Sequence, residues 1–93
     1  MKYKIKYTSQ MKSDLKIASK QHRNMDKFFD VVEMLANGER LPIQYRDHSL
    51  SGKYSNVREC HIEPDWLLVY EYIGNELILM LHRLGTHSEL FKK

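Results

Sequence analysis

The chain has 93 residues, a formal net charge of +3, and 42% hydrophobic and 29% charged residues. This length supports one domain, residues 1–93, with a small core, and leaves no room for a second. The longest apolar runs, residues 66–70 and 77–81, fall far short of the roughly 20 residues that cross a bilayer, so we expect no membrane-spanning segment and no membrane partner.

The single cysteine, Cys60, cannot form a disulfide within the chain, and the first residues lack the apolar core of a secretion signal. We therefore expect a cytoplasmic protein. Its positive charge favours polyanionic partners such as nucleic acids.

Residues 2–8 alternate lysine with tyrosine or isoleucine, which predicts an edge strand with a basic outer face. Ser9 is a good N-cap for a first helix that reaches Arg23, with an apolar stripe that ends at His22. A second stripe of this helix is cationic and consists of Lys12, Lys16, Lys20 and Arg23. It either binds a nucleic-acid backbone or is an ordinary solvated face.

A second helix is expected next, with Asn24 as its cap and apolar residues at helical spacing through Ala36. Asn37 and Gly38 provide a left-handed stop, so the two helices would form a hairpin. Residues 39–54 show no regular pattern, and we expect a loop with a functional or partner-binding role.

Three more strands are predicted at residues 56–62, 66–73 and 76–83, with turns at residues 63–65 and 74–75. The last strand is apolar at both parities, so both its faces should be covered, and only one of His82 and Arg83 can face a given side.

Beyond Gly85, Thr86 and Glu89 fit a capping box that starts a short helical turn, with His87 at its first position and Leu90 and Phe91 as apolar anchors. The expected fold class is therefore α+β. A helical hairpin packs on a small, mostly antiparallel sheet, in the order strand, helix, helix, strand, strand, strand, with a short C-terminal helical turn.

The residues suited to acid–base and phosphate chemistry are His48, His61, Asp65, Arg83 and His87. Histidine titrates near neutral pH, so two imidazoles can act as base and acid in one reaction. Arginine stays charged, and its planar fork matches phosphate oxygens. This set suits the cleavage of a phosphodiester.

Three blocks of sequence, residues 47–50, 58–70 and 83–91, resemble the YafQ branch of the RelE toxin superfamily. With the lysine-rich helices and the element order, the resemblance covers nearly the whole chain. It implies a RelE-like fold and an endoribonuclease that cuts mRNA in the A site of the ribosome, on the 30S subunit, as the toxin of a bacterial toxin–antitoxin pair. The implied partners are the ribosome, its mRNA and a cognate antitoxin. The residues that match the family's active-site set are His48, His61, Asp65, Trp66, Arg83, His87 and Phe91.

RNA carries its own nucleophile, the 2′-hydroxyl, so the expected chemistry needs neither a metal nor a cofactor and yields a 2′,3′-cyclic phosphate or a 3′-phosphate. His87 is the leading candidate for general acid, and His48, His61 or Asp65 is the base or orients it. Arg83 would stabilise the charged phosphorane. Trp66 and Phe91 would shape the site or stack on a base.

Each residue also has a structural interpretation. Trp66 can simply fill the core, Asp65 suits a turn, and Phe91 can anchor the tail. We interpret His22 and His82 as structural, and Cys60 as a small buried hydrophobe. A zinc site is a chemical alternative, although neither a His-x-x-x-His nor a Cys-x-x-Cys spacing is present.

A protein on the same scaffold that binds nucleic acid or protein without catalysis, as gyrase-poisoning toxins do, is the functional alternative. In either case we expect an antitoxin whose flexible segment folds over the basic groove or the active residues.

Overall fold

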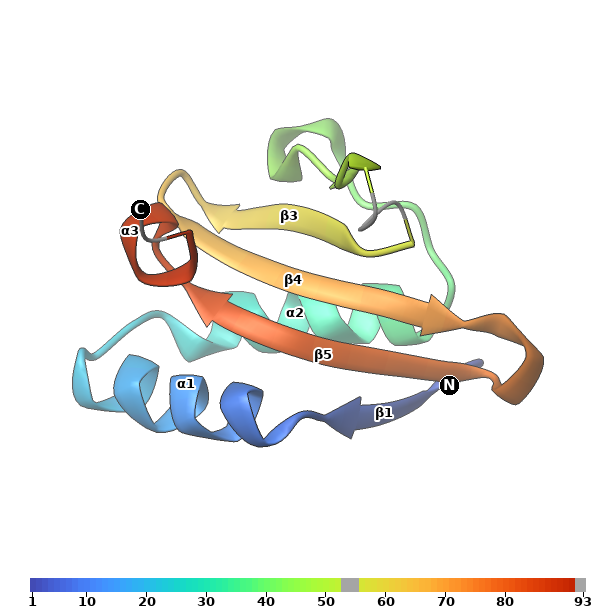
Figure 1. The fold of residues 1–93 in the computed structure, drawn as a ribbon, viewed down its shortest axis with the longest axis horizontal. Coiled ribbons are helices and arrows are strands. Elements are labelled where there is room, and N and C mark those ends of the chain that lie inside the picture. Colours follow the sequence, from blue (N-terminus) through green and yellow to red (C-terminus); the bar gives the residue numbers. More distant parts are fainter. Residues whose placement is uncertain (53–55, 92–93) are drawn as a thin grey trace.

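The computed structural model describes residues 1–52 and 56–91, and within these ranges the chain forms one sheet of five strands (Figure 1). The strands lie in the order β1-β5-β4-β3-β2. Their bounds are β1 (Lys4–Tyr7), β2 (His48–Ser49), β3 (Arg58–Glu63), β4 (Trp66–Ile73) and β5 (Ile78–Gly85). β1 runs parallel to β5 and the other pairs are antiparallel, which confirms the mostly antiparallel sheet with β1 at its edge.

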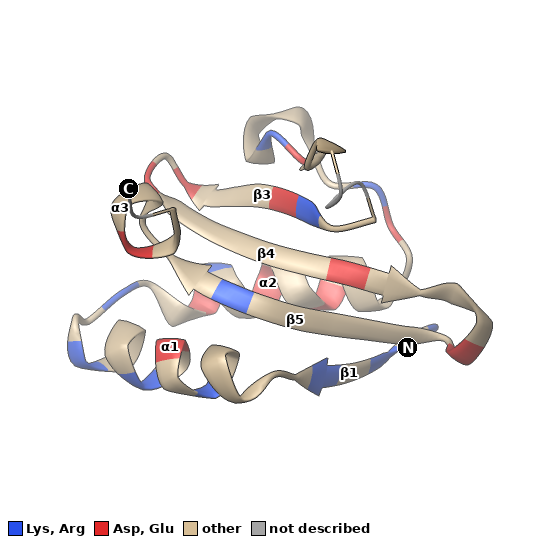
Figure 2. Cartoon of the chain, viewed as in Figure 1, with Lys and Arg blue, Asp and Glu red and all other residues tan. Residues whose placement is uncertain are grey.

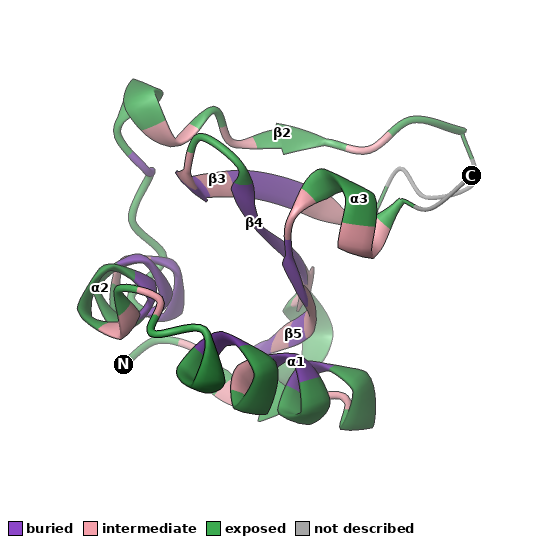
Figure 3. Ribbon diagram, turned by 90° about the vertical axis from the view of Figure 1, so that its left-hand side faces the viewer, coloured by how far each residue is buried: buried purple, intermediate pink, exposed green. Residues whose placement is uncertain are grey.

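Two helices, α1 (Ser9–Lys20) and α2 (Met25–Ala36), pack on this sheet and give the predicted α+β class. α1 contacts β5 and β1, whereas α2 contacts β3. In Figure 3, α2 and the short helix α3 (His87–Leu90) lie on opposite sides of the sheet, and β2 continues the sheet beyond β3. The core between helices and sheet includes Met11, Phe28, Leu35, Cys60, Trp66, Leu68, Tyr70, Leu79 and Leu81. None of the helices in the described ranges is long and apolar enough to cross a membrane.

The first helix differs from its prediction at both ends. Thr8, not Ser9, is its N-cap, because the Thr8 hydroxyl accepts a hydrogen bond from the Met11 amide at 3.0 Å. The helix ends at Lys20, and His22 is exposed with a φ of 57°. A left-handed residue terminates a helix, so the predicted place of His22 on the buried stripe is wrong.

The ends of the second helix agree with the prediction. The Asn24 side chain accepts a hydrogen bond from the Lys27 amide at 3.3 Å, and Gly38 has a φ of 76°. Both ends depend on local chemistry, a capping amide and a residue that tolerates left-handed backbone.

The predicted loop of residues 39–54 contains two short elements, the 3₁₀ helix η1 (Ile43–Tyr45) and β2, while residues 53–55 lie outside the described ranges. β2 pairs with β3, with His48 opposite Glu59. The Asp47 carboxylate secures this pairing by accepting hydrogen bonds from Arg58, at 3.0 Å, and from the buried Tyr70 hydroxyl. A strand of two residues has no periodicity, so sequence reasoning missed it.

β5 contains a bulge that reverses its side-chain alternation. Tyr70 pairs with Leu81 and Val69 with Arg83, so His82 is the extra residue. As a result Leu81 and Leu84 are both buried in the core. His82 and Arg83 line one pocket together, so the prediction that they must face opposite sides is wrong.

The connections around β4 and β5 agree only in part. The turn of residues 63–65 joins β3 to β4 as predicted, and Thr86 and Glu89 form the predicted capping box of α3. The residues before β5 instead form a 3₁₀ helix, η3 (Gly74–Glu76), followed by Leu77 with a φ of 54°. Leu77 is half exposed rather than covered, because the strand starts at Ile78.

Candidate active site

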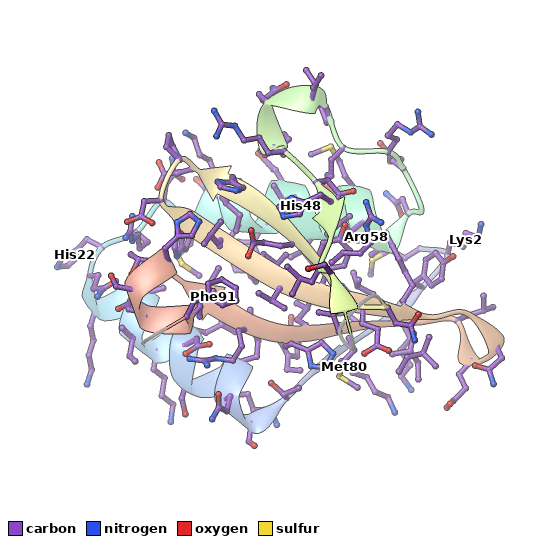
Figure 4. The ribbon with its side chains drawn as sticks, turned by 45° about the horizontal axis from the view of Figure 1, so that its top comes forward. Lys2, His22, His48, Arg58, Met80 and Phe91 are labelled. Atoms are coloured by element: carbon purple, nitrogen blue, oxygen red, sulfur yellow. The ribbon has the colours of Figure 1, made fainter. Side chains whose placement is uncertain are left out.

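Three of the predicted histidines come together on the face of the sheet that α2 leaves uncovered. His48 is on β2, His61 on β3 and His87 at the first position of α3. The ring centre of His61 lies 6.5 Å from that of His48 and 5.6 Å from that of His87. Figure 4 shows His48 and Phe91 over this face, and the Phe91 ring centre lies 6.4 Å from that of His87. We call His48, His61 and His87 the histidine cluster.

Asp65 holds His87 at two atoms. Its Oδ1 accepts a hydrogen bond from the His87 amide at 3.1 Å and lies 2.9 Å from the imidazole Nδ1. The hydrogen bond from the His87 amide lowers the pKa of Asp65 most, and the hydrogen bond from the His87 imidazole lowers it further. An ionised carboxylate can only accept, so Nδ1 carries the proton and Nε2 is left for chemistry. The tight β3–β4 turn brings this carboxylate to the start of α3.

Glu59 is a site residue that sequence reasoning missed. It is 5% exposed, and its Oε1 lies 3.5 Å from Nε2 of His48 and 3.8 Å from Nε2 of His61. One buried carboxylate oxygen therefore lies within 4 Å of two imidazoles. A signal existed, because Glu59 and His61 are two residues apart on one strand and must share a face.

Ligand atoms of Glu59, His61 and His87 lie within 4.8 Å of one another, so these three side chains could hold a metal ion. The set combines two imidazoles and a carboxylate, as many transition-metal sites do. Sequence spacing did not reveal it, because Glu59 and His61 come from β3 whereas His87 comes from α3, 26 positions further along the chain.

Arg83 lies apart from the contacts of the histidine cluster. Its Nε and Nη2 donate to the carboxylate of Asp14 on α1, at 2.8 and 3.3 Å, and Asp14 also accepts the Leu84 amide at 2.9 Å. This partner raises the pKa of Arg83. Arg83 and Phe91 line the same pocket, which places Arg83 near the aromatic side chain that lies next to His87.

Trp66 and Arg23 are both held by contacts within the protein. Trp66 is 1% exposed, so base stacking on its ring is contradicted and it fills the core. The guanidinium of Arg23 lies 5.4 Å from the Trp66 ring centre and 3.8 Å from a Glu63 oxygen. Phe91, by contrast, is 45% exposed.

The lysines of the predicted cationic stripe are all exposed on α1, which lies along the edge of the sheet opposite β2 (Figure 2). They are Lys12, Lys16 and Lys20. The structure does not bring them into the histidine cluster, so any contact they make with RNA is separate from the reacting groups.

The remaining candidates have structural contacts. His82 Nε2 lies 2.9 Å from a Glu71 oxygen across the β4–β5 pair. Cys60 is fully buried in the core, and burial raises the pKa of its thiol. A protonated, buried thiol is a poor nucleophile, in agreement with the prediction that Cys60 is a small hydrophobe.

The fold is that of small bacterial toxins. A metal-bound toxin from Helicobacter pylori, solved as a crystal structure, superposes with a TM-score of 0.91 at 42% identity, covering 96% of this chain and 99% of that one. A chain of the crystal structure of the Escherichia coli DinJ–YafQ toxin–antitoxin complex superposes with a TM-score of 0.88 at 37% identity. The match covers 98% of this chain and 99% of that one.

The sequence comparison is equally specific. A family model described as a bacterial toxin of type II toxin–antitoxin system, YafQ, matches residues 3–92. The mRNA interferase toxin YafQ of E. coli strain K12 is 39% identical over 88 residues, 94% of each chain. This chain belongs to the YafQ family of type II toxins, which confirms the resemblance.

Proposed function

We propose that this protein is an mRNA interferase, a ribosome-dependent endoribonuclease that cuts mRNA in the ribosomal A site. Membership of the YafQ family and the name of the E. coli relative support the class of activity. The observation that carries the mechanism is the row of imidazoles at 6.5 and 5.6 Å, flanked by the carboxylates of Glu59 and Asp65. Such a row can take a proton at one end and deliver another a short distance away.

In this mechanism a base removes the proton of the 2′-hydroxyl, and the 2′-oxygen attacks the adjoining phosphorus. The bond from phosphorus to the 5′-oxygen breaks, and His87 Nε2 gives its proton to that oxygen. The product is a 2′,3′-cyclic phosphate, which water can open to a 3′-phosphate. His61 and His48, both beside Glu59, are the candidates for the base. Asp65 orients His87 through Nδ1.

Arg83 would stabilise the extra negative charge on the phosphorane. Asp14 occupies Nε and Nη2, and the structure gives Nη1 no partner among the described residues. A guanidinium held on one side by a buried carboxylate keeps a fixed orientation and can offer its remaining N–H groups to phosphate oxygens. Phe91, exposed beside His87, would pack against a base.

The proposed setting is the bacterial cytoplasm, where the partners are the ribosome, mRNA and a cognate antitoxin. The net charge of +3 and the exposed lysines of α1 favour ribosomal RNA. The E. coli relative forms a complex with DinJ. By analogy, an antitoxin segment would cover the histidine cluster and exclude the mRNA.

Replacing His87 tests the proposal. His87→Ala removes the proposed acid, so we expect cleavage of mRNA on translating ribosomes to fall by at least about 100-fold, the usual contribution of general acid catalysis. Growth arrest should be lost with it. Primer extension on mRNA, with and without translation, measures the cuts. His22→Ala changes an exposed histidine outside the site and should keep parental activity.

Growth arrest by His87→Ala as strong as that of the parent, with intact mRNA in both, would instead favour a gyrase-poison type of toxin.

A second experiment addresses the metal-binding geometry of Glu59, His61 and His87. Acid–base catalysis should survive EDTA in a purified cleavage reaction. Mg²⁺ in excess over EDTA keeps the ribosomes intact, while EDTA still removes zinc because it binds zinc far more tightly. Complete loss that zinc restores would contradict metal-independent cleavage.

A further inference from the structure

A pocket of about 430 Å³ opens beside the histidine cluster, between η1, α2 and the β3–β4 turn. Its volume lies within the range of about 300–1,000 Å³ that is common for small-ligand sites. The side chains used below are Lys27, Gln44, Tyr45, Arg46, His61 and Glu63. Because His61 belongs to both the pocket and the cluster, a ligand in the pocket touches a candidate catalytic side chain.

The wall of this pocket combines three kinds of group. Tyr45 is half-buried and packs against the core, so its ring is held in place. Gln44 and Arg46 are exposed and supply an amide and a cation. Lys27 lies 3.5 Å from a Glu63 oxygen. Arg46 has no ion-pair partner among the described residues, so it is the cation that the wall offers to a ligand.

A nucleotide of single-stranded RNA is complementary to this set. Its base can stack on an aromatic ring, the polar edge of the base can pair with an amide, and its phosphate can bind a guanidinium. A glutamine amide can donate and accept at once, which suits a base edge that does both.

The pocket wall is also joined to the cluster through the backbone. Arg46 has a φ of 49°, and its carbonyl oxygen lies 2.8 Å from Nδ1 of His48. The ring contacts run in the order His48, His61, His87, Phe91. The pocket adjoins the His48–His61 end of this row, and Phe91 lies at the other end.

We propose that this pocket binds the nucleotide on one side of the scissile phosphate, and that Gln44 and Arg46 determine which base is accepted and how tightly. The proposal rests on the proposed endoribonuclease function. The cut then falls between a nucleotide held at Tyr45 and one held at Phe91, which fixes the reacting linkage over the histidines.

The test compares two pocket variants with two matched controls. Gln44→Ala should flatten the distribution of bases around mapped cut sites. Arg46→Asn keeps a residue that tolerates left-handed backbone, and should raise the KM for programmed ribosomes about tenfold while kcat changes by less than twofold. Gln10→Ala and Arg40→Asn alter exposed residues that do not line the pocket, and should leave both readouts at parental values.

Unchanged cut-site distribution and KM in both pocket variants would overturn the inference while leaving the nuclease intact. A second measurement does not depend on cleavage. A 2′-deoxy trinucleotide lacks the nucleophile, and its addition should shift the NMR amide signals of residues 44–46 in the parent and much less in Arg46→Asn. If those shifts are absent, the pocket does not bind a nucleotide, even if the parent protein cuts RNA. If they are present, they support nucleotide binding in the pocket, even if the parent protein does not cut RNA.

Discussion

Asp65 and His87 form a pair in which each residue limits the freedom of the other. Asp65 is exposed, so its lowered pKa comes from the two hydrogen bonds with His87 rather than from burial. A carboxyl whose pKa is lowered in the folded state stabilises the fold fully at a pH above its ordinary pKa of 3.8. This stabilisation is lost as the pH falls through the lowered pKa. The Asp65 carboxylate therefore stays ionised, and able to accept the hydrogen bonds from His87, throughout the neutral pH range.

An NMR titration of the Asp65 carboxyl tests this pair. We expect a midpoint below 3.8 in the parent protein, and a midpoint that moves up toward that value in His87→Ala, since both the side-chain bond and its charge are removed. His48→Ala removes an imidazole that does not contact Asp65 and should leave the midpoint unchanged. An identical midpoint in the parent and His87→Ala would show that the contact does not exist in solution.

At the scale of elements, α3 carries His87 although it has only four residues. So short a helix is not stable alone. Its capping box supplies two hydrogen bonds: Thr86 Oγ1 accepts from the Glu89 amide at 3.2 Å, and Glu89 Oε1 accepts from the Thr86 amide at 2.8 Å. Gly85 makes room for it, because a Cβ there would lie 3.0 Å from Glu89 Oε1.

Removing the cap should therefore lower both stability and activity. We expect Thr86→Ala to reduce the free energy of unfolding by about 1 kcal/mol, the usual value of an N-cap, and to reduce cleavage because His87 loses its fixed position. Urea denaturation and primer extension measure the two effects. Ser88→Ala, at an exposed position of the same helix, should change neither. Full cleavage by a destabilised Thr86→Ala would mean that Asp65 alone positions His87.

At the scale of the whole molecule, the reacting groups and the exposed lysines of α1 occupy different regions. The histidine cluster lies on the uncovered face near β2, whereas α1 packs along β5 at the other edge of the sheet (Figures 1 and 3). This separation suits a protein that grips a large RNA surface with one region and cuts a short substrate with another.

The α1 lysines should thus control affinity for the ribosome without changing the chemistry. Replacing Lys12, Lys16 and Lys20 together by glutamine should weaken ribosome binding and lower the slope of log affinity against log salt by about 2, because each phosphate contact contributes about 0.7–0.9. Cleavage by saturating protein should stay near parental. The same change at Lys2, Lys4 and Lys6 removes equal charge from β1 and the residues just before it. An equal loss in both variants would show that net charge, not the α1 surface, is responsible.

Local sequence determined much of this protein. Asn24 and Gly38 mark the ends of α2, Thr86 and Glu89 start α3, and residues 66–73 form β4 as their β-branched and aromatic content predicts. The caps and stops depend on neighbours within about four residues, so a single sequence contains what is needed to predict them.

Tertiary structure alone decided which candidates meet. It placed Glu59 between two imidazoles, paired Arg83 with Asp14 across 69 positions of the chain, and buried Trp66 in the core. Each outcome depends on strand register, on the bulge at His82 and on the packing of α1 against β5. Register and packing are set by the summed burial of many side chains, and one inserted residue reverses which face a side chain occupies, so no local pattern can predict these contacts.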